Sequence, residues 1–106
     1  MADSPALTES TYYILLSLIE PRHGYGIMQR AEELSGGRVR LAAGTLYGAL
    51  SVLCDKGWIV PLPGDGESRR KEYVLTDKGL DILIKEIRRL RELADNGAKV
   101  LGEVME

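Results

Sequence analysis

Apolar residues recur at helical spacing in four stretches of the chain, which predicts four helices. The first runs from Thr8, its expected N-cap, to about Ile19, and Pro21 stops it. Its apolar side chains cover nearly the whole circumference, so we expect this helix to be buried on every side. In so small a domain, one of those sides must pack against something other than the domain's own core. A second copy of the chain would provide that surface.

A turn at residues 22–24 leads into a second predicted helix, from about Tyr25 to Leu34. Three of its residues are expected to face inward, namely Ile27, Ala31 and Leu34. Two glycines, Gly36 and Gly37, end it. Residues 38–41 then alternate polar and apolar side chains, which indicates a short strand.

The third predicted helix, residues 43–57, has two contrasting faces. One face is apolar and carries Leu46, Leu50 and Leu53. The other is small and uncharged, with Tyr47 and Cys54 on its flank, and consists of Gly44, Thr45, Gly48 and Ser51. Such a face can approach another surface closely, and the DNA major groove admits a helix of this size. A helix buried on both sides would show the same pattern, and these residues alone leave both interpretations open.

A hairpin is predicted to follow, with strands at residues 58–62 and 69–75 joined by turn-forming residues. Pro61 places the first strand at a sheet edge, and Trp58 is interpreted as a core residue. The second strand begins with three cations, Arg69, Arg70 and Lys71. A run of charge is often only solvated, but directly after the third helix it is also placed to contact phosphates.

The last predicted helix is capped by Thr76 and carries a continuous apolar stripe of Leu80, Leu83, Ile84, Ile87, Leu90 and Ala94. Leu101 extends this stripe after a weak point at residues 96–97. From Thr76 to Asp95 the helix is roughly 30 Å long, about the width of a small domain. The stripe should therefore overrun its own core and form a homodimer interface, with Tyr12 and Leu16 of the first helix meeting Ile84, Ile87, Leu90 and Ala94.

These elements predict a mostly α fold with a small antiparallel β wing. Two helices of about ten residues with a brief connector suggest a helix-turn-helix. Residues 1–75 are expected to form the DNA-binding domain, and residues 76–106 a dimerisation helix packed on it.

Composition and charge narrow the function. The chain has 106 residues, 44% of them hydrophobic, and no apolar run approaches the length of a membrane span. A single cysteine and an N-terminus without a signal-peptide pattern favour the cytoplasm. The net charge of −2 hides an excess of +3 over residues 36–71, between ends of −3 and −2. A locally basic middle fits a phosphate-facing surface.

Catalysis and cofactors are not indicated. His23 is the only histidine and Cys54 the only cysteine, so the residues needed for a metal cluster are missing. A second function class is a protein–protein interaction module that does not bind DNA. The wing distinguishes these two function classes. If its cations pair with acidic residues of the same molecule, the DNA-binding interpretation is weakened.

Five motifs in the correct order resemble the PadR-type transcriptional regulators over residues 7–95. They are His23-Gly24-Tyr25-Gly26-Ile27, Gly44-Thr45-Leu46-Tyr47, Gly57-Trp58-Ile59, Arg70-Lys71-Glu72-Tyr73 and Leu75-Thr76-Asp77-Lys78-Gly79. The resemblance implies a winged helix-turn-helix, and the brief C-terminal part is like a small subfamily that dimerises through its first and last helices. One departure is Gly48, where the family commonly has proline, and this glycine costs helix stability.

The resemblance also implies roles for particular residues. Thr45, Tyr47, Gly48 and Ser51 would lie on the recognition helix, with Tyr25 near the DNA backbone and with Arg69, Arg70 and Lys71 on the wing. Similar proteins repress promoters and release double-stranded DNA when a small aromatic or cationic compound binds. The aromatic candidates for such an effector site at the dimer interface are Tyr12 and Tyr13, for which core packing is the simpler interpretation.

Overall fold

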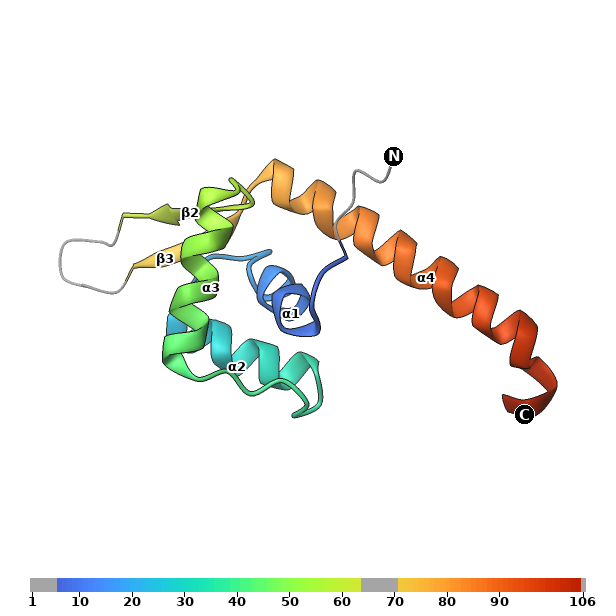
Figure 1. The fold of residues 1–106 in the computed structure, drawn as a ribbon. Coiled ribbons are helices and arrows are strands. Elements are labelled where there is room, and N and C mark those ends of the chain that lie inside the picture. Colours follow the sequence, from blue (N-terminus) through green and yellow to red (C-terminus); the bar gives the residue numbers. More distant parts are fainter. Residues whose placement is uncertain (1–5, 64–70, 106) are drawn as a thin grey trace.

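A computed structural model describes residues 6–63 and 71–105. Its elements in chain order are α1 (Glu9–Ser17), β1 (Arg22–His23), α2 (Gly24–Leu34), α3 (Ala43–Asp55), β2 (Ile59–Leu62), β3 (Glu72–Leu75) and α4 (Asp77–Met105). The first three helices pack around one core (Figure 1). The strands β2 and β3 extend from one side of this core, and α4 extends from the other. The predicted mostly α fold with a small antiparallel wing is confirmed.

α1 begins at the predicted cap, because the Thr8 side chain accepts a hydrogen bond from the Thr11 backbone N–H at 3.1 Å. Its inner side is fully buried through Ile14, Leu15 and Leu18. The expectation of burial on every side is not met within one chain, since Ile19, just after the helix, is 56% exposed. The described residues therefore leave the outer side of this segment exposed.

Three predictions around α2 are wrong. Residues 22–23, expected to be a turn, form β1, which pairs with β3, whereas residues 38–41 form no strand. At that point Val39 is buried and its N–H donates to the Ser35 hydroxyl at 2.9 Å, so a side chain satisfies the backbone instead of a sheet partner. Leu34, expected to face inward, is 39% exposed, while Ile27 and Ala31 are buried as predicted.

The three strands form an antiparallel sheet in the order β1-β3-β2. Pro61 lies in the edge strand β2, as predicted, where its missing N–H costs no ladder bond. Trp58 lies just before β2 and is buried, and β3 is shorter than predicted because it begins at Glu72. The sheet is tied to α1 by a hydrogen bond from the Leu75 N–H to the Leu18 carbonyl at 2.9 Å.

A tight junction joins the end of α3 to the start of α4. α3 ends at Asp55, two residues before the predicted end, and Gly57 turns the chain with a φ of 76°. Thr76 caps α4 as predicted, since its hydroxyl accepts from the Gly79 N–H at 3.0 Å. A Cβ on Gly79 would collide with the Trp58 carbonyl oxygen, so only glycine fits there.

α4 is a single helix of 29 residues, with no interruption at the expected weak point of residues 96–97. Its first half packs on the core through Ile82, Leu83 and Glu86. The second half extends away from the other helices (Figure 1), and the molecule measures 58 Å along its longest axis and 32 Å along the next. Residues 91–100 of this helix are all exposed, so its outer part does not belong to the core that the described residues form.

Candidate nucleic-acid interface

α3 presents the small, uncharged face that the sequence predicts, and this face is open to solvent. Leu46, Leu50 and Leu53 are buried, whereas Gly44, Thr45, Gly48 and Ser51 are all exposed. A Cβ placed on either glycine would have no heavy atom within 4 Å. Within this chain, α3 is not a helix buried on both sides. A low surface of glycine, threonine and serine is what the structure offers at this position.

Tyr47 borders that face and lies over the start of α2. It is 52% exposed, and its ring covers the buried residue Gly24. A Cβ on Gly24 would lie 2.8 Å from the Tyr47 Cζ atom and closer still to its hydroxyl oxygen. The sequence alone does not predict this role of Gly24, because no local pattern indicates that residues 23 positions apart are in contact.

Tyr25 projects from the first turn of α2 and is 59% exposed. Its hydroxyl accepts a hydrogen bond from the Gln29 side-chain amide at 3.3 Å, which fixes the ring along the helix surface. The N-cap of α2 is His23, whose Nδ1 accepts a hydrogen bond from the Gly26 N–H at 3.3 Å. The only histidine of the chain is therefore used as a helix cap.

Cations lie around α3, although not all of them are available. Lys71 is exposed at the start of the returning strand, and no described carboxylate forms an ion pair with it. Arg40 precedes α3 and is exposed, whereas Arg38 is held by Glu9 at 2.9 Å. The two remaining predicted wing cations, Arg69 and Arg70, lie outside the described residues.

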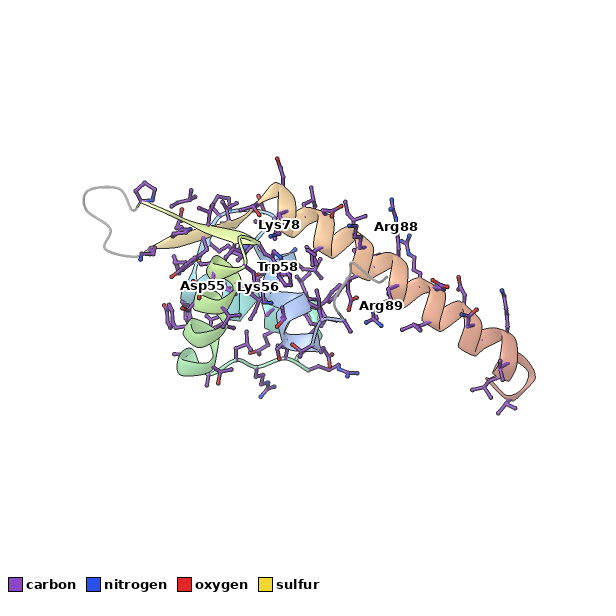
Figure 2. All side chains as sticks on the ribbon, turned by 45° about the horizontal axis from the view of Figure 1, so that its top comes forward. Asp55, Lys56, Trp58, Lys78, Arg88 and Arg89 are labelled. Atoms are coloured by element: carbon purple, nitrogen blue, oxygen red, sulfur yellow. The ribbon has the colours of Figure 1, made fainter. Side chains whose placement is uncertain are left out.

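A second group of charged residues lies where α3 ends. Asp55, Lys56 and Lys78 gather around Trp58 in Figure 2. The Lys56 ammonium lies 5.1 Å from the centre of the Trp58 ring, a distance that suits a cation–π contact. Lys56 and Lys78 are not predicted from the sequence as interface residues, since neither belongs to a run of charge.

The residues predicted for a dimer interface are only partly covered in the single chain. Tyr12, Leu16 and Ile87 are half-buried, and Ile84, Leu90 and Ala94 are exposed. Farther along α4, four more apolar side chains are exposed, namely Leu93, Val100, Leu101 and Val104. The apolar surface of α4 thus continues well past the point where its own core ends.

Tyr12 and Tyr13, the predicted effector residues, lie edge to face with their ring centres 5.4 Å apart. They line a hollow of about 260 Å³ together with Leu7, Glu9, Glu86 and Leu90. Burial, followed by the nearby Tyr13 and Glu86 side chains, raises the pKa of the Tyr12 hydroxyl, so this phenol stays neutral.

Glu86 is a buried carboxylate at the base of this hollow, with only 1% of its surface exposed. Arg89 donates to it twice, from Nε at 2.7 Å and from Nη2 at 2.9 Å, and the Leu7 N–H donates at 3.0 Å. These donors, the Arg89 guanidinium first, lower the pKa of Glu86 despite its burial. Figure 2 shows Arg89 and its neighbour Arg88 leaving α4 on different sides.

The described part of the chain contains no grouped metal ligands, and its cysteine is not activated. Residues 6–63 and 71–105 contain no group of three or more His, Cys, Asp or Glu side chains that could hold a metal ion. Burial raises the pKa of the Cys54 thiol, which disfavours the reactive thiolate. No helix among the described residues is long and apolar enough to cross a membrane.

A helix-turn-helix followed by a β hairpin and packed on a long terminal helix defines the winged-helix class of DNA-binding proteins. Residues 14–85 match the PadR-like family of transcriptional regulators, and the chain belongs to this family. The family is one of transcriptional regulators, which bind DNA.

Solved structures agree with this assignment. A PadR family transcriptional regulator from Eggerthella lenta is 28% identical, with a TM-score of 0.70 over 86% of this chain and 80% of that one. A PadR family regulator from Clostridium difficile has a TM-score of 0.73 over 93% of this chain and 100% of that one; at 24% identity this likeness shows the fold.

A curated relative is an uncharacterized 37.1 kDa protein of transposon TN4556 from Streptomyces fradiae. It is 38% identical over 86 residues, which are 81% of this chain. The match spans only 22% of that relative's length.

Proposed function

We propose that the chain is a sequence-specific repressor that binds a pseudo-palindromic operator as a homodimer in the cytoplasm. The observation that carries the proposal is the exposed, uncharged outer face of α3, which has room to enter a major groove. Thr45 and Ser51 would read base edges by hydrogen bonds, and Gly48 would let the backbone approach the groove. With no arginine on this face to bind a base in bidentate fashion, shape and bridging waters would carry much of the specificity.

The phosphate contacts would come from the two ends of this surface. Tyr25 would contact the backbone from the start of α2, and Lys71 would do so from the wing, together with Arg69 and Arg70. This proposal is supported by the exposure of the Tyr25 and Lys71 side chains to solvent. Such contacts position the protein on DNA and carry little sequence information.

Residues 76–106 would serve dimerisation, while residues 1–75 bind DNA. Two uncovered apolar surfaces support this proposal. One is the stripe along the outer half of α4, and the other consists of Leu16, Ile19 and Leu34 on the outer side of α1 and α2. If α4 of one copy packs on α1 of the other, both surfaces are covered at once, and the recognition helices face successive major grooves about 34 Å apart.

A small effector would bind in the hollow beside Tyr12 and Tyr13. An aromatic cation fits best, because the Tyr12 and Tyr13 rings line the hollow and can hold a cation over their faces. The two carboxylates there, Glu9 and Glu86, are already paired with Arg38 and Arg89. Its volume of about 260 Å³ is small for a ligand pocket, so a second copy would have to complete it. We expect phenyltrimethylammonium to shift the NMR signals of Tyr12, and a matching shift by benzoate would contradict the choice of a cation.

The DNA proposal is tested by selecting bound duplexes from a random library and titrating the best one. Ser51→Ala should change the ranking of related sequences, because it removes a base-reading hydroxyl. Lys71→Ala should weaken binding to all sequences alike, because it removes a phosphate contact. Lys99→Ala, on the far part of α4, is the matched control and should leave binding unchanged.

Two outcomes would count against the proposal. If wild type selects no sequence and binds no duplex, the chain is better explained as a protein–protein interaction module. If Lys71→Ala changes sequence preference while Ser51→Ala does not, the assignment of the reading and positioning surfaces is wrong.

A further inference from the structure

The contact between Gly24 and Tyr47 joins the two helices of the helix-turn-helix at the edge of the proposed DNA-facing surface. Gly24 is the first residue of α2 and is buried, and the Tyr47 ring of α3 covers it. Tyr47 is nevertheless 52% exposed, so one side of the ring is held while the other faces solvent. The ring therefore occupies space that is open because Gly24 has no side chain. It is not buried in the core.

The backbone does not require glycine at this position. Gly24 is not among the glycines with positive φ, which are Gly36, Gly37 and Gly57. Alanine would fit its helical conformation and would favour the helix. Alanine would instead clash with the Tyr47 ring, since the alanine Cβ would lie 2.8 Å from the Tyr47 Cζ atom.

We propose that Gly24 is a positioning residue for recognition: it provides the space in which the Tyr47 ring lies and so keeps the neighbouring face of α3 low. This inference rests on the proposed DNA binding by α3. Ser51 lies one helical turn beyond Tyr47, at i+4 on the same side. Because side chains on a helix lean toward its N-terminus, a ring displaced from Gly24 would swing out over the turn that carries Gly44 and obstruct the surface that must approach the groove.

The consequence is a loss of recognition without a loss of folding. Because the ring already lies half in solvent, it can rotate away from an added methyl group without opening the core. Gly24→Ala should therefore leave the chain folded and reduce affinity for the selected duplex by about tenfold, the effect expected for one lost base contact. Its preference among related sequences should change as well.

The chain supplies a matched control two residues away. Gly26 lies in the same first turn of α2, and a Cβ there would meet its nearest atoms at 3.6–3.9 Å, an ordinary contact distance. Gly26→Ala gives the same gain in helix propensity with no displaced ring. It should bind the selected duplex within about twofold of wild type, well below the tenfold effect of losing one base contact.

The test combines affinity titrations with a double-mutant cycle and an NMR measurement. In the Tyr47→Ala background, adding Gly24→Ala should have no further effect on affinity, because no ring is left to displace. In the free protein, nuclear Overhauser contacts between the Tyr47 ring and the Gly24 Hα atoms should be present in wild type. They should be absent once Gly24→Ala is introduced.

The inference is overturned if Gly24→Ala binds like wild type, or if it weakens binding as much with Tyr47 replaced as with Tyr47 present. It is also overturned if the Overhauser contacts are missing in wild type. Failure of the proposed function looks different: wild type then binds no duplex, while the Overhauser contacts between Tyr47 and Gly24 remain.

Discussion

Glu86 shows at the scale of one residue how a buried charge holds this fold together. Its carboxylate takes two hydrogen bonds from Arg89 on the same helix and one from the backbone of Leu7, 79 positions away in sequence. A buried carboxylate is stable in its charged form only when donors surround it. Here those donors connect the segment before α1 to the middle of α4.

Glu86→Gln should lower the free energy of unfolding by about 1–3 kcal/mol at neutral pH, because the amide turns a donor toward Arg89. Glu86 has a folded pKa below its unfolded value, so its stabilisation is complete above the unfolded pKa of about 4.3. That stabilisation disappears as the pH falls through the lower folded pKa. Urea denaturation of both proteins from pH 7 to pH 3 should therefore show the difference closing in acid.

The exposed Glu92→Gln is the control for this experiment and should differ little from wild type at any pH. A constant difference between wild type and Glu86→Gln down to pH 3 would contradict the role given to the ionised carboxylate.

Gly48 is a second informative residue, because it stands in the interior of α3 with open space around it. Gly48→Ala should raise the free energy of unfolding by about 0.5–1 kcal/mol, since alanine restricts the unfolded chain and favours the helix. Thermal denaturation measures this gain. The same variant should bind the selected duplex less tightly if the backbone of α3 closely approaches DNA; unchanged affinity would place that approach elsewhere on the helix.

At the scale of elements, α4 has two halves with different surroundings. The first half is anchored by Leu83 and Ile82, which are buried against the core. In the second half, Leu93 is 53% exposed and Val100 is 81% exposed. A helix of this length with one uncovered apolar side is stable when something packs against that side. The two halves should therefore respond differently to substitution.

Replacing Leu93 and Val100 together by glutamate should convert the proposed dimer into a monomer, because two charges would be buried in an apolar contact. Light scattering measures the mass in solution. The near-ultraviolet signal of Trp58, the only tryptophan, should stay unchanged because the core is untouched. Arg88→Glu with Lys99→Glu is the control, since both residues are charged and exposed already. A monomeric wild type would refute the dimer proposal.

At the scale of the whole molecule, the charge distribution explains why one copy should bind DNA weakly. The chain carries a net charge of −2, and one cation of its basic middle, Arg38, is held by Glu9. The net excess of positive charge over residues 36–71 is only +3, so a single copy attracts phosphates weakly. Pairing two copies doubles that number without changing the chain, which makes assembly part of the binding mechanism.

The salt dependence of binding should report this doubling. Each phosphate neutralised contributes about −0.9 to the slope of log affinity against log salt concentration. Wild type should therefore show about twice the slope of the monomeric glutamate variant, when both are titrated with the selected duplex by fluorescence anisotropy. Equal slopes would mean that only one copy contacts DNA.

The sequence predicted the helices and the wing because their patterns are local. Leu46, Leu50 and Leu53 fall on one side of α3 by spacing alone, and Thr8 and Thr76 cap their helices by contacts within one turn. The resemblance to the PadR family rested on motifs of the same local kind. It correctly gave the class of protein.

Local sequence patterns gave wrong secondary-structure predictions where the pairing segment is distant in sequence. Residues 38–41 alternate as a strand would, but no described strand pairs with them. Residues 22–23 carry no strand pattern and pair with β3. Secondary structure at such short segments is decided by what lies next to them in space.

The amino-acid sequence alone determined which side of each helix is apolar, where the helices begin, and that α3 carries an uncharged face. Only the tertiary structure decided that the Tyr47 ring lies over Gly24, that Glu86 binds the backbone of Leu7, and that half of α4 is left uncovered. The reason is physical: periodicity and capping act within a few residues, whereas contacts across the fold depend on how the elements pack.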